Sequence, residues 1–249
     1  MENLKIKPWN APDANIPQSI FEPKGMLGEE ERRCLYWLGR HVFSNRGSII
    51  DAGAFLGASA FSLAQGLVDA GYRTSKPLIH SYDTFVAGDD YVAETINRDI
   101  RPISKGESFL DIFRAQNARH SALVEPHAGD FLAQRWTRGP IEILFIDVAK
   151  NRDLNSHLLR EFFPHLIPGH SIVIQQDFYH VWHPYIHVTM EYLKDCFEVL
   201  DPFVDHQSRL YRLIRPIPPD ALERAALYDF SLSERLSLLE SAAAASPSP

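Results

Sequence analysis

Residues 51–59 carry an acid, two glycines and a serine at a spacing suited to a ligand-binding turn. They read Asp-Ala-Gly-Ala-Phe-Leu-Gly-Ala-Ser and follow a short apolar run. Gly53 allows a tight turn, and Gly57 lets a ligand approach the backbone where the N–H groups of a following helix are free. The spacing fails the dinucleotide pattern Gly-x-Gly-x-x-Gly, because Phe55 and Ala58 occupy its second and third glycine positions. It also lacks the Gly-Lys-Ser/Thr of a phosphate-binding P-loop.

Two further acids follow apolar runs and suit the binding of a nucleoside. Asp83 follows the run 78–82, far enough beyond Gly57 to leave room for one helix and one strand. A carboxylate at such a strand end accepts hydrogen bonds from the two hydroxyls of a ribose. Asp130 follows the run 123–128 within His-Ala-Gly-Asp-Phe. Each acid also has a plainer interpretation, since Asp83 suits a surface turn and Asp130 suits the N-cap of a helix.

Asp147 and Asp177 each follow a strongly apolar run, within Phe-Ile-Asp-Val-Ala-Lys and Gln-Gln-Asp-Phe-Tyr-His. A lone carboxylate in such a position is costly unless it is paired, hydrogen-bonded or catalytic. If the two runs are neighbouring strands, their carboxylates lie close enough to share a divalent cation through oxygen ligands.

Three histidines after Asp177 are candidates for acid–base chemistry. Histidine is suited to removing a hydroxyl proton near neutral pH, and His180 is the first candidate base, with His183 second. His183 and His187 also have the four-residue spacing of a zinc pair, but Pro184 separates them and makes His183 pre-helical. An ordinary packing or surface role remains an alternative for each histidine.

The elements that must position these residues alternate between strands and helices. Strands are expected at 47–54, 78–82, 123–128, 141–147, 171–175, 197–204 and 208–214, and helices at 28–43, 57–70, 107–120, 153–163, 184–195 and, in two pieces, 219–245. This alternation predicts the α/β class, with a doubly wound, mostly parallel seven-stranded sheet whose ligands bind beyond the carboxyl ends of the strands. The polar connection 86–106 is long enough for a lid, or it contains a short helix that packs on the surface.

From Gly47 to about Tyr192 the chain resembles class I S-adenosylmethionine-dependent methyltransferases, in particular the macrocin O-methyltransferase (TylF)-like and cephalosporin-hydroxylase-like group. The resemblance rests on Asp51–Ser59, Asp83–Phe85, Phe145–Asp147 and the stretch from Phe163 through Pro168-Gly169 to Gln176-Asp177-Phe178. It implies a Rossmann-like methyltransferase fold and S-adenosylmethionine as the cofactor. The residues it implies for cofactor binding are Asp51, Gly53, Ala54, Gly57, Ser59, Asp83, Thr84, Phe85, Gly129, Asp130, Phe131 and Asp147.

The chain departs from this group at the predicted metal site. The group supplies three carboxylates to magnesium, and Asp147 and Asp177 match two of them, but Gln176 stands at the third position. An amide oxygen is an acceptable ligand for a hard cation, yet it removes one negative charge, so magnesium binding is expected to be weaker or absent. If the ammonium of Lys150 reached the site, it would replace the charge of the metal.

Composition narrows the class of protein. The 249 residues include 25 Lys+Arg against 32 Asp+Glu, and the formal net charge of −7 comes without a basic stripe, so no nucleic-acid partner is expected. No apolar run approaches the length of a membrane span, no signal peptide is recognisable, and the two cysteines suggest a reducing compartment, so a cytoplasmic protein is expected. The predicted organisation is an irregular arm (1–27), a methyltransferase domain (28–215) that begins with an N-terminal helical extension, a C-terminal helical extension (216–245) and a disordered tail (246–249).

The expected function is O-methylation of a hydroxyl on a small-molecule acceptor, a sugar or secondary metabolite. His180, Asp147, Asp177 and His183 are the predicted catalytic residues, and Asp147, Gln176 and Asp177 are the ligands of any magnesium ion. Two alternatives remain open, a catalytically inactive S-adenosylmethionine-binding or regulatory protein of this fold and, with less support, a nicotinamide-dependent oxidoreductase. The N-terminal arm and C-terminal helices leave a homodimer open without requiring one.

Overall fold

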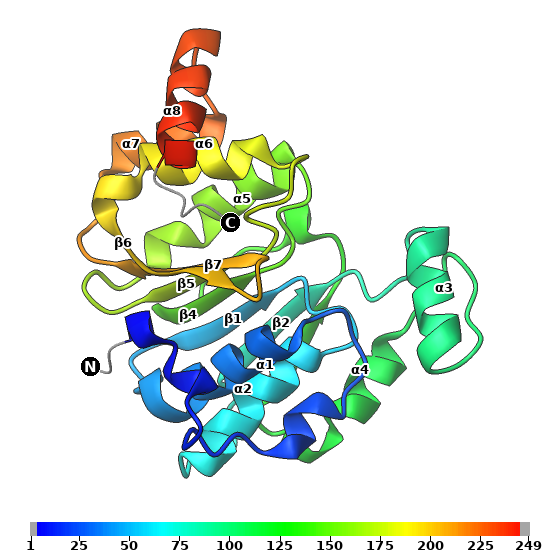
Figure 1. Ribbon diagram of the computed structural model, residues 1–249. Helices are drawn as coiled ribbons and strands as arrows, with labels where there is room; N and C mark the ends of the chain where they lie inside the picture. The colour runs from blue at the N-terminus through cyan, green and yellow to red at the C-terminus, as the bar shows by residue number, and fades with distance from the viewer. Residues whose placement is uncertain (1–3, 245–249) are drawn as a thin grey trace. The chain divides into compact units, whose positions relative to one another are not determined.

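The computed structural model describes residues 4–244, and its seven strands form one sheet in the order β3-β2-β1-β4-β5-β7-β6 (Figure 1). The strands are β1 (Ser48–Ala52), β2 (Ile79–Asp83), β3 (Val124–Ala128), β4 (Ile141–Ile146), β5 (Ile172–Gln175), β6 (Phe197–Val204) and β7 (Ser208–Leu213). β2 pairs with β3 and β4 with β5 in parallel, whereas β7 is antiparallel to both β5 and β6. The predicted doubly wound, mostly parallel seven-stranded sheet is confirmed.

The chain divides into two compact units, which are described separately. The first contains residues 7–43 and 51–131, and the second contains residues 4–6, 44–50 and 132–244 of the described chain. The domain boundaries predicted near residues 28 and 215 stay predictions. The tail predicted at 246–249 lies outside the described residues.

In the first unit, α2 (Ala58–Asp69) packs on β2, and α1 (Glu29–Trp37) packs on α2 (Figure 1). α1 begins with three glutamates, which the positive end of the helix dipole stabilises. A π-helical turn, Leu38–Val42, extends it, so the helix predicted at 28–43 is present in two forms. The remaining helices of this unit are α3 (Asp90–Asp99) and α4 (Leu110–Gln116).

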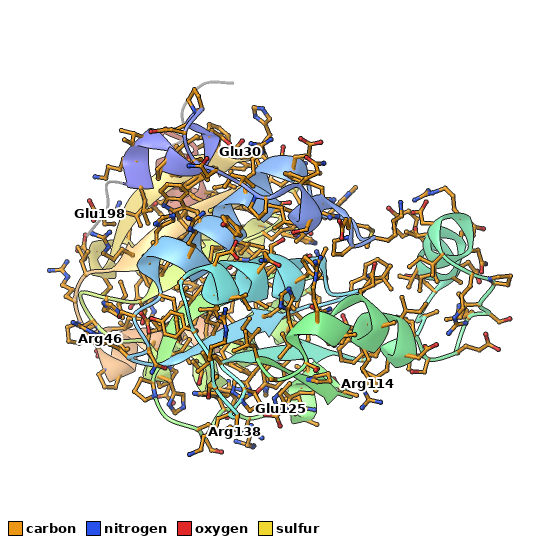
Figure 2. All side chains as sticks on the ribbon, turned by 90° about the horizontal axis from the view of Figure 1, so that it is seen from below. Glu30, Arg46, Arg114, Glu125, Arg138 and Glu198 are labelled. Carbon is orange, nitrogen blue, oxygen red and sulfur yellow. The ribbon has the colours of Figure 1, made fainter. Side chains whose placement is uncertain are left out.

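The N-terminal arm packs against α1 through short 3-10 turns rather than running free. Trp9 and Ile20 in these turns are completely buried. Glu30 of α1 accepts hydrogen bonds from the side chains of Lys7 (2.9 Å), Trp9 (3.4 Å) and Asn10 (3.1 Å), and Figure 2 shows it beside this segment. Arg32 donates to the backbone carbonyl of Ile20 and to two others of the arm. The polar arm is therefore an ordered part of the first unit.

The long connection 86–106 contains α3, whose N-cap Asp89 accepts a hydrogen bond from the N–H of Val92 (2.8 Å). A β-bridge between Val86 and Ser108 closes the base of this segment. The short helix of the second interpretation is therefore present, whereas a role of this segment as a lid stays a prediction.

In the second unit, α5 (Arg152–Glu161) packs on α7 (Pro219–Leu227), and α6 (Pro184–Tyr192) packs on α8 (Leu232–Ala244). The two-piece C-terminal helix is confirmed within the described residues. None of the helices in residues 4–244 has the length and apolar character needed to cross a lipid bilayer.

An acid that the sequence pattern did not single out lies inside β4. Glu142 is 1% exposed. It accepts hydrogen bonds from the backbone N–H groups of Ser44 (2.6 Å), Arg46 (2.7 Å) and Gly47 (3.3 Å), and His170 Nε2 lies 2.8 Å away. These donors offset the cost of burying the carboxylate and fix the turn that leads into β1.

Candidate functional site

Asp83, the last residue of β2, holds the glycine-containing loop through its carboxylate. Oδ2 accepts a hydrogen bond from the backbone N–H of Phe55 (2.9 Å), and Oδ1 accepts one from the N–H of Phe85 (2.8 Å). Burial raises the pKa of this carboxyl above its usual range, and the two backbone donors oppose that rise. Oδ1 also accepts a hydrogen bond from the hydroxyl of the exposed Thr84 (3.3 Å), which a ligand hydroxyl can replace, and Oδ2 keeps a further lone pair, so the oriented carboxylate can still accept hydrogen bonds from a ligand.

The two residues whose backbone N–H groups donate to Asp83 have unusual backbone conformations. Phe55 has φ of 44° and Phe85 has φ of 51°, in the left-handed region that bulky residues rarely adopt. Such conformations cost about 1–3 kcal/mol each and persist only where the surroundings enforce them, which is often at ligand sites. Here the enforcing contacts are the shared carboxylate and the ring of Phe109, which packs edge-on against both phenylalanines.

The loop between β1 and α2 is also fixed from behind. The N–H groups of Gly53 and Ala54 donate to the carbonyl oxygen of Tyr82 (2.9 and 3.1 Å). Gly57 has φ of 91°, and a Cβ there would collide with the side chain of Asn117. Packing against the end of α4 thus requires glycine at position 57. The sequence suggested a different reason for this glycine, namely the close approach of a ligand to the backbone.

Other predicted cofactor residues of this unit differ in exposure. Asp51 is completely buried and accepts a hydrogen bond from the hydroxyl of Ser81 (2.9 Å). Ser59 is buried in the first turn of α2, and Thr84 is exposed beside the Asp83 carboxylate. The predicted role of Asp51 in cofactor binding stays a prediction.

The end of β3 adjoins the end of β2. The N–H of Gly129 donates to the backbone carbonyl of Asp83 (3.0 Å). Asp130 is exposed, whereas Phe131 is buried and packs edge-on against Tyr82 with 5.9 Å between ring centroids. The structure therefore brings Gly53, Asp83, Phe85 and Gly129 together at the carboxyl ends of three strands, and the predicted roles of Asp130 and Phe131 in cofactor binding stay predictions.

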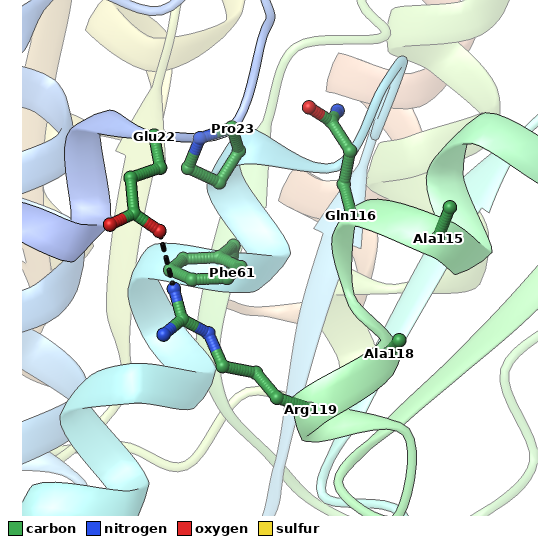
Figure 3. A pocket seen from close by; sticks show the side chains of 7 residues that line it. All are labelled: Glu22, Pro23, Phe61, Ala115, Gln116, Ala118 and Arg119. Carbon is green, nitrogen blue, oxygen red and sulfur yellow. Dashed lines mark hydrogen bonds and ion pairs between the residues drawn. The ribbon is translucent and has the colours of Figure 1, made fainter.

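A surface hollow of about 370 Å³ in the first unit is lined by none of the predicted cofactor residues (Figure 3). Arg119 crosses it, paired with Glu22 at 3.1 Å and stacked over the ring of Phe61 at 4.3 Å. The hollow lies where the N-terminal arm meets α2 and α4, and we assign it to packing of the arm.

In the second unit, Lys150 joins the two acids that were predicted to bind a metal. Its ammonium forms ion pairs with both Asp147 and Asp177 and lies 3.3 Å from the side-chain oxygen of Gln176. Burial alone would lower the pKa of Lys150, but the two carboxylates hold it above its usual range. The ammonium therefore stays charged and occupies the position between the oxygens.

This arrangement does not fit a magnesium ion. The oxygens of Asp147, Gln176 and Asp177 converge on the ammonium of Lys150, and a divalent cation at that point would be repelled by it. The departure at position 176 is consistent with this finding, because one of the usual negative charges is missing and a fixed positive charge is present. Magnesium at these residues is not supported.

Two of the three histidines lie together and the third does not. The rings of His180 and His183 stack with 4.6 Å between centroids, and His183 is the N-cap residue of α6, as its position before Pro184 predicted. His187 instead packs on Phe178, with 4.3 Å between ring centroids, and lines a separate cavity of about 230 Å³. The zinc pair His183–His187 is therefore not formed.

His183 has properties that suit a proton acceptor. It is 7% exposed, and its Nδ1 has no hydrogen-bond partner within the described residues. Burial lowers its pKa, as do the charges of His180 and Lys150, whereas Asp177 opposes the shift. The imidazole is therefore neutral near pH 7. His180, the first candidate from the sequence, is exposed.

The aromatic residues near these histidines differ in their exposure and partners. The hydroxyl of Tyr179 donates to the carbonyl of Pro202 (2.6 Å), and that of Tyr185 donates to the carbonyl of Ala149 (2.9 Å). Trp182 is 77% exposed. Tyr185 is buried and Tyr179 is half-buried, so Trp182 is the most exposed of the three.

Comparison with protein-family models gives no match, and comparison with curated protein sequences gives none either. Solved structures do match. The O-methyltransferase NovP aligns with a TM-score of 0.53 at 16% identity, over 75% of this chain and 79% of that one. The chain has a Rossmann-like methyltransferase fold. At this identity the likeness establishes the fold alone, and it agrees with the resemblance drawn from the strand-end motifs.

Two weaker matches are also O-methyltransferases by description. CalS11, a TDP-rhamnose 3'-O-methyltransferase of calicheamicin biosynthesis, has a TM-score of 0.48 and 16% identity, over 84% of this chain and 90% of that one. An O-methyltransferase from Bacillus cereus, in complex with SAH, has a TM-score of 0.38 and 14% identity, over 78% and 71%. With TM-scores below 0.5, they add nothing to the fold assignment.

Proposed function

We propose that the chain is an S-adenosylmethionine-dependent methyltransferase that methylates a hydroxyl of a sugar or another small natural product. The observation that carries the proposal is the Asp83 carboxylate, oriented at the end of β2 by the N–H groups of two residues in left-handed conformations. Strain of this kind is maintained where a ligand needs it. A preorganised acceptor at this strand end suits the two hydroxyls of a ribose.

The residues of the first unit would bind and orient the cofactor, which when bound supplies an electrophilic methyl group. Asp83 would accept hydrogen bonds from the ribose through its remaining lone pairs, and Asp130, which is exposed, would accept one from the adenine amino group. The backbone of Gly53 and Ala54 is fixed by Tyr82, so this part of the loop need not rearrange on binding.

The residues of the second unit would serve the acceptor. The methyl acceptor must lose its hydroxyl proton, and neutral His183, next to His180 and influenced by the charge of Asp177, is suited to take it. Lys150 would hold Asp147 and Asp177 in place and supply a positive charge where related enzymes are expected to use magnesium. On this proposal the reaction needs no divalent metal.

The proposal is tested first by isothermal titration calorimetry with S-adenosylhomocysteine, with NAD as the comparison ligand. We expect saturable binding of the former and none of the latter. Folded protein that fails to bind S-adenosylhomocysteine would exclude the proposal, and binding of NAD would favour an oxidoreductase.

A second candidate is a protein that binds the cofactor without catalysis. Lys150 favours it, because the predicted metal position is filled. Conversion of S-adenosylmethionine to S-adenosylhomocysteine, measured with a panel of nucleotide-activated sugars and with EDTA present, separates the two. Asp177→Ala and His183→Ala should abolish turnover while cofactor affinity stays within about twofold. Full turnover in both variants would show that the acceptor residues are wrongly assigned.

A further inference from the structure

Two histidines and a glutamate from neighbouring strands lie on one face of the β2–β3 pair. The register pairs His80 with Glu125, and Tyr82 with His127. Successive side chains of a strand point to opposite faces, so His80 and Tyr82 share a face that Ser81 does not. The cluster is therefore separate from the face on which Ser81 meets the glycine-containing motif.

The ligand atoms of these three residues converge. Nδ1 of His80 lies 3.0 Å from Nε2 of His127 and 3.3 Å from Oε2 of Glu125, and all three atoms lie within 4.8 Å of one another. Zinc binds imidazole nitrogen and carboxylate oxygen at about 2.0–2.2 Å, so two ligand atoms on one tetrahedral ion are about 3.3–3.6 Å apart. The distance from His80 to Glu125 lies in this range, and the distance from His80 to His127 is about 0.3 Å below it, a difference that small side-chain rotations can remove.

The surroundings hold the histidines while leaving access from solvent. The His80 side chain is 4% exposed, and the His127 ring stacks on Tyr82 with 4.5 Å between centroids and 14° between planes. Glu125 remains one-third exposed and is labelled in Figure 2. A cation therefore has a route to the cluster, and water can complete its coordination.

We propose that His80, Glu125 and His127 form a binding site for a divalent transition metal of the zinc type. Two imidazoles and one carboxylate favour zinc over magnesium, which prefers oxygen ligands. Because the ligands come from two strands, the ion links β3 to β2. The site is independent of the proposed methyl transfer, and neither depends on the other.

Metal-free, the same residues can form a hydrogen-bonded set in which one imidazole donates to the other. The two arrangements are distinguished by zinc titration: a metal site binds zinc and loses affinity when a ligating residue is replaced, whereas a set that is only hydrogen-bonded binds no zinc. Zinc requires both imidazoles to be deprotonated, so its affinity should fall at acidic pH.

The test uses the full chain without a polyhistidine tag, stripped with EDTA and then titrated with zinc in competition with a chromophoric chelator. We expect a site of 1:1 stoichiometry that His127→Gln and Glu125→Gln each weaken by more than about tenfold. His41→Gln, at an exposed histidine of the same unit, should leave the affinity unchanged. His80 is left intact in these variants because its side chain is nearly completely buried.

Thermal unfolding gives an independent measurement, because a ligand that binds only the folded state raises the midpoint. Zinc should raise the midpoint of the wild type and of His41→Gln, but not that of His127→Gln, with far-ultraviolet circular dichroism confirming that each variant is folded. Absence of zinc binding by the wild type would overturn the proposal. So would affinity that survives both His127→Gln and Glu125→Gln, since the ion would then be bound elsewhere, for example at Asp177 and His183.

Discussion

Replacing Asp83 by asparagine should weaken both the fold of the first unit and cofactor binding. The two backbone donors bond to different oxygens of the carboxylate, at 2.9 and 2.8 Å. Asparagine offers one oxygen and one NH₂ group, so either the Phe55 or the Phe85 N–H must face another donor. A hydrogen bond to a charged group contributes about 1.5–3 kcal/mol, and the neutral amide regains part of this because it costs less to bury. We therefore expect a loss of about 2 kcal/mol in the free energy of unfolding.

Binding of S-adenosylhomocysteine should fall by more than this change in stability explains. An acceptor for the ribose hydroxyls loses its charge, which corresponds to a roughly 10- to 100-fold weaker Kd at about 1.4 kcal/mol per tenfold. Guanidinium unfolding measures the first effect, and calorimetry on protein that is fully folded measures the second.

Asp89→Asn is the matched control for this substitution. Asp89 caps α3 through one hydrogen bond from Val92, and asparagine caps a helix equally well. The control should therefore behave as the wild type. If Asp83→Asn also matched the wild type in stability and in affinity, the carboxylate would have neither of the roles assigned to it.

Three further outcomes are expected. Lys150→Met should leave Asp147 and Asp177 facing each other and create magnesium binding that the wild type lacks, as measured by calorimetry; magnesium binding by the wild type would contradict the assignment. Burial lowers the pKa of His120 to about 4 in the folded protein, against 6.5 in the unfolded chain. The free energy of unfolding should therefore be highest above pH 6.5 and fall between pH 6.5 and 4, where the unfolded chain binds a proton that the folded protein does not. The loss should reach about 2–3 kcal/mol, and His120→Phe should abolish it. If the free energy of unfolding of the wild type and of His120→Phe changed with pH in the same way, this expectation would be refuted. Gly57→Ala should destabilise the protein by about 2 kcal/mol or more, by thermal unfolding, because its φ of 91° and the space beside it both disfavour a Cβ.

Much of the fold could be predicted from local patterns. The buried run of β4 and the alternation of strands with helices predicted the sheet. Boundaries were less accurate: the helix predicted at 107–120 is a short α4 followed by a 3-10 turn, Ala118–His120. Tertiary packing decides how far a weakly amphipathic helix extends, which a local pattern does not contain.

For the site, the sequence predicted which residues end the strands but not what their side chains contact. Phe131, predicted beside a cofactor, packs edge-on against Tyr82, and His187 packs on Phe178 rather than beside His183. Glu142 gave no signal at all, because its donors come from a loop about one hundred residues earlier. These outcomes depend on which face of an element is covered, and residues distant in sequence decide that.

The amino-acid sequence by itself determined the order of strands and helices and the positions of the acids at the strand ends, because period and turn chemistry are local properties. Only the tertiary structure decided that Lys150 lies between Asp147 and Asp177, and that His80 meets Glu125 and His127. The physical reason is that these side chains come from segments far apart in the sequence, so whether they contact one another depends on how those segments pack. For His80, Glu125 and His127 it depends on strand register, and a shift of one residue would turn the side chains of one strand to the opposite face.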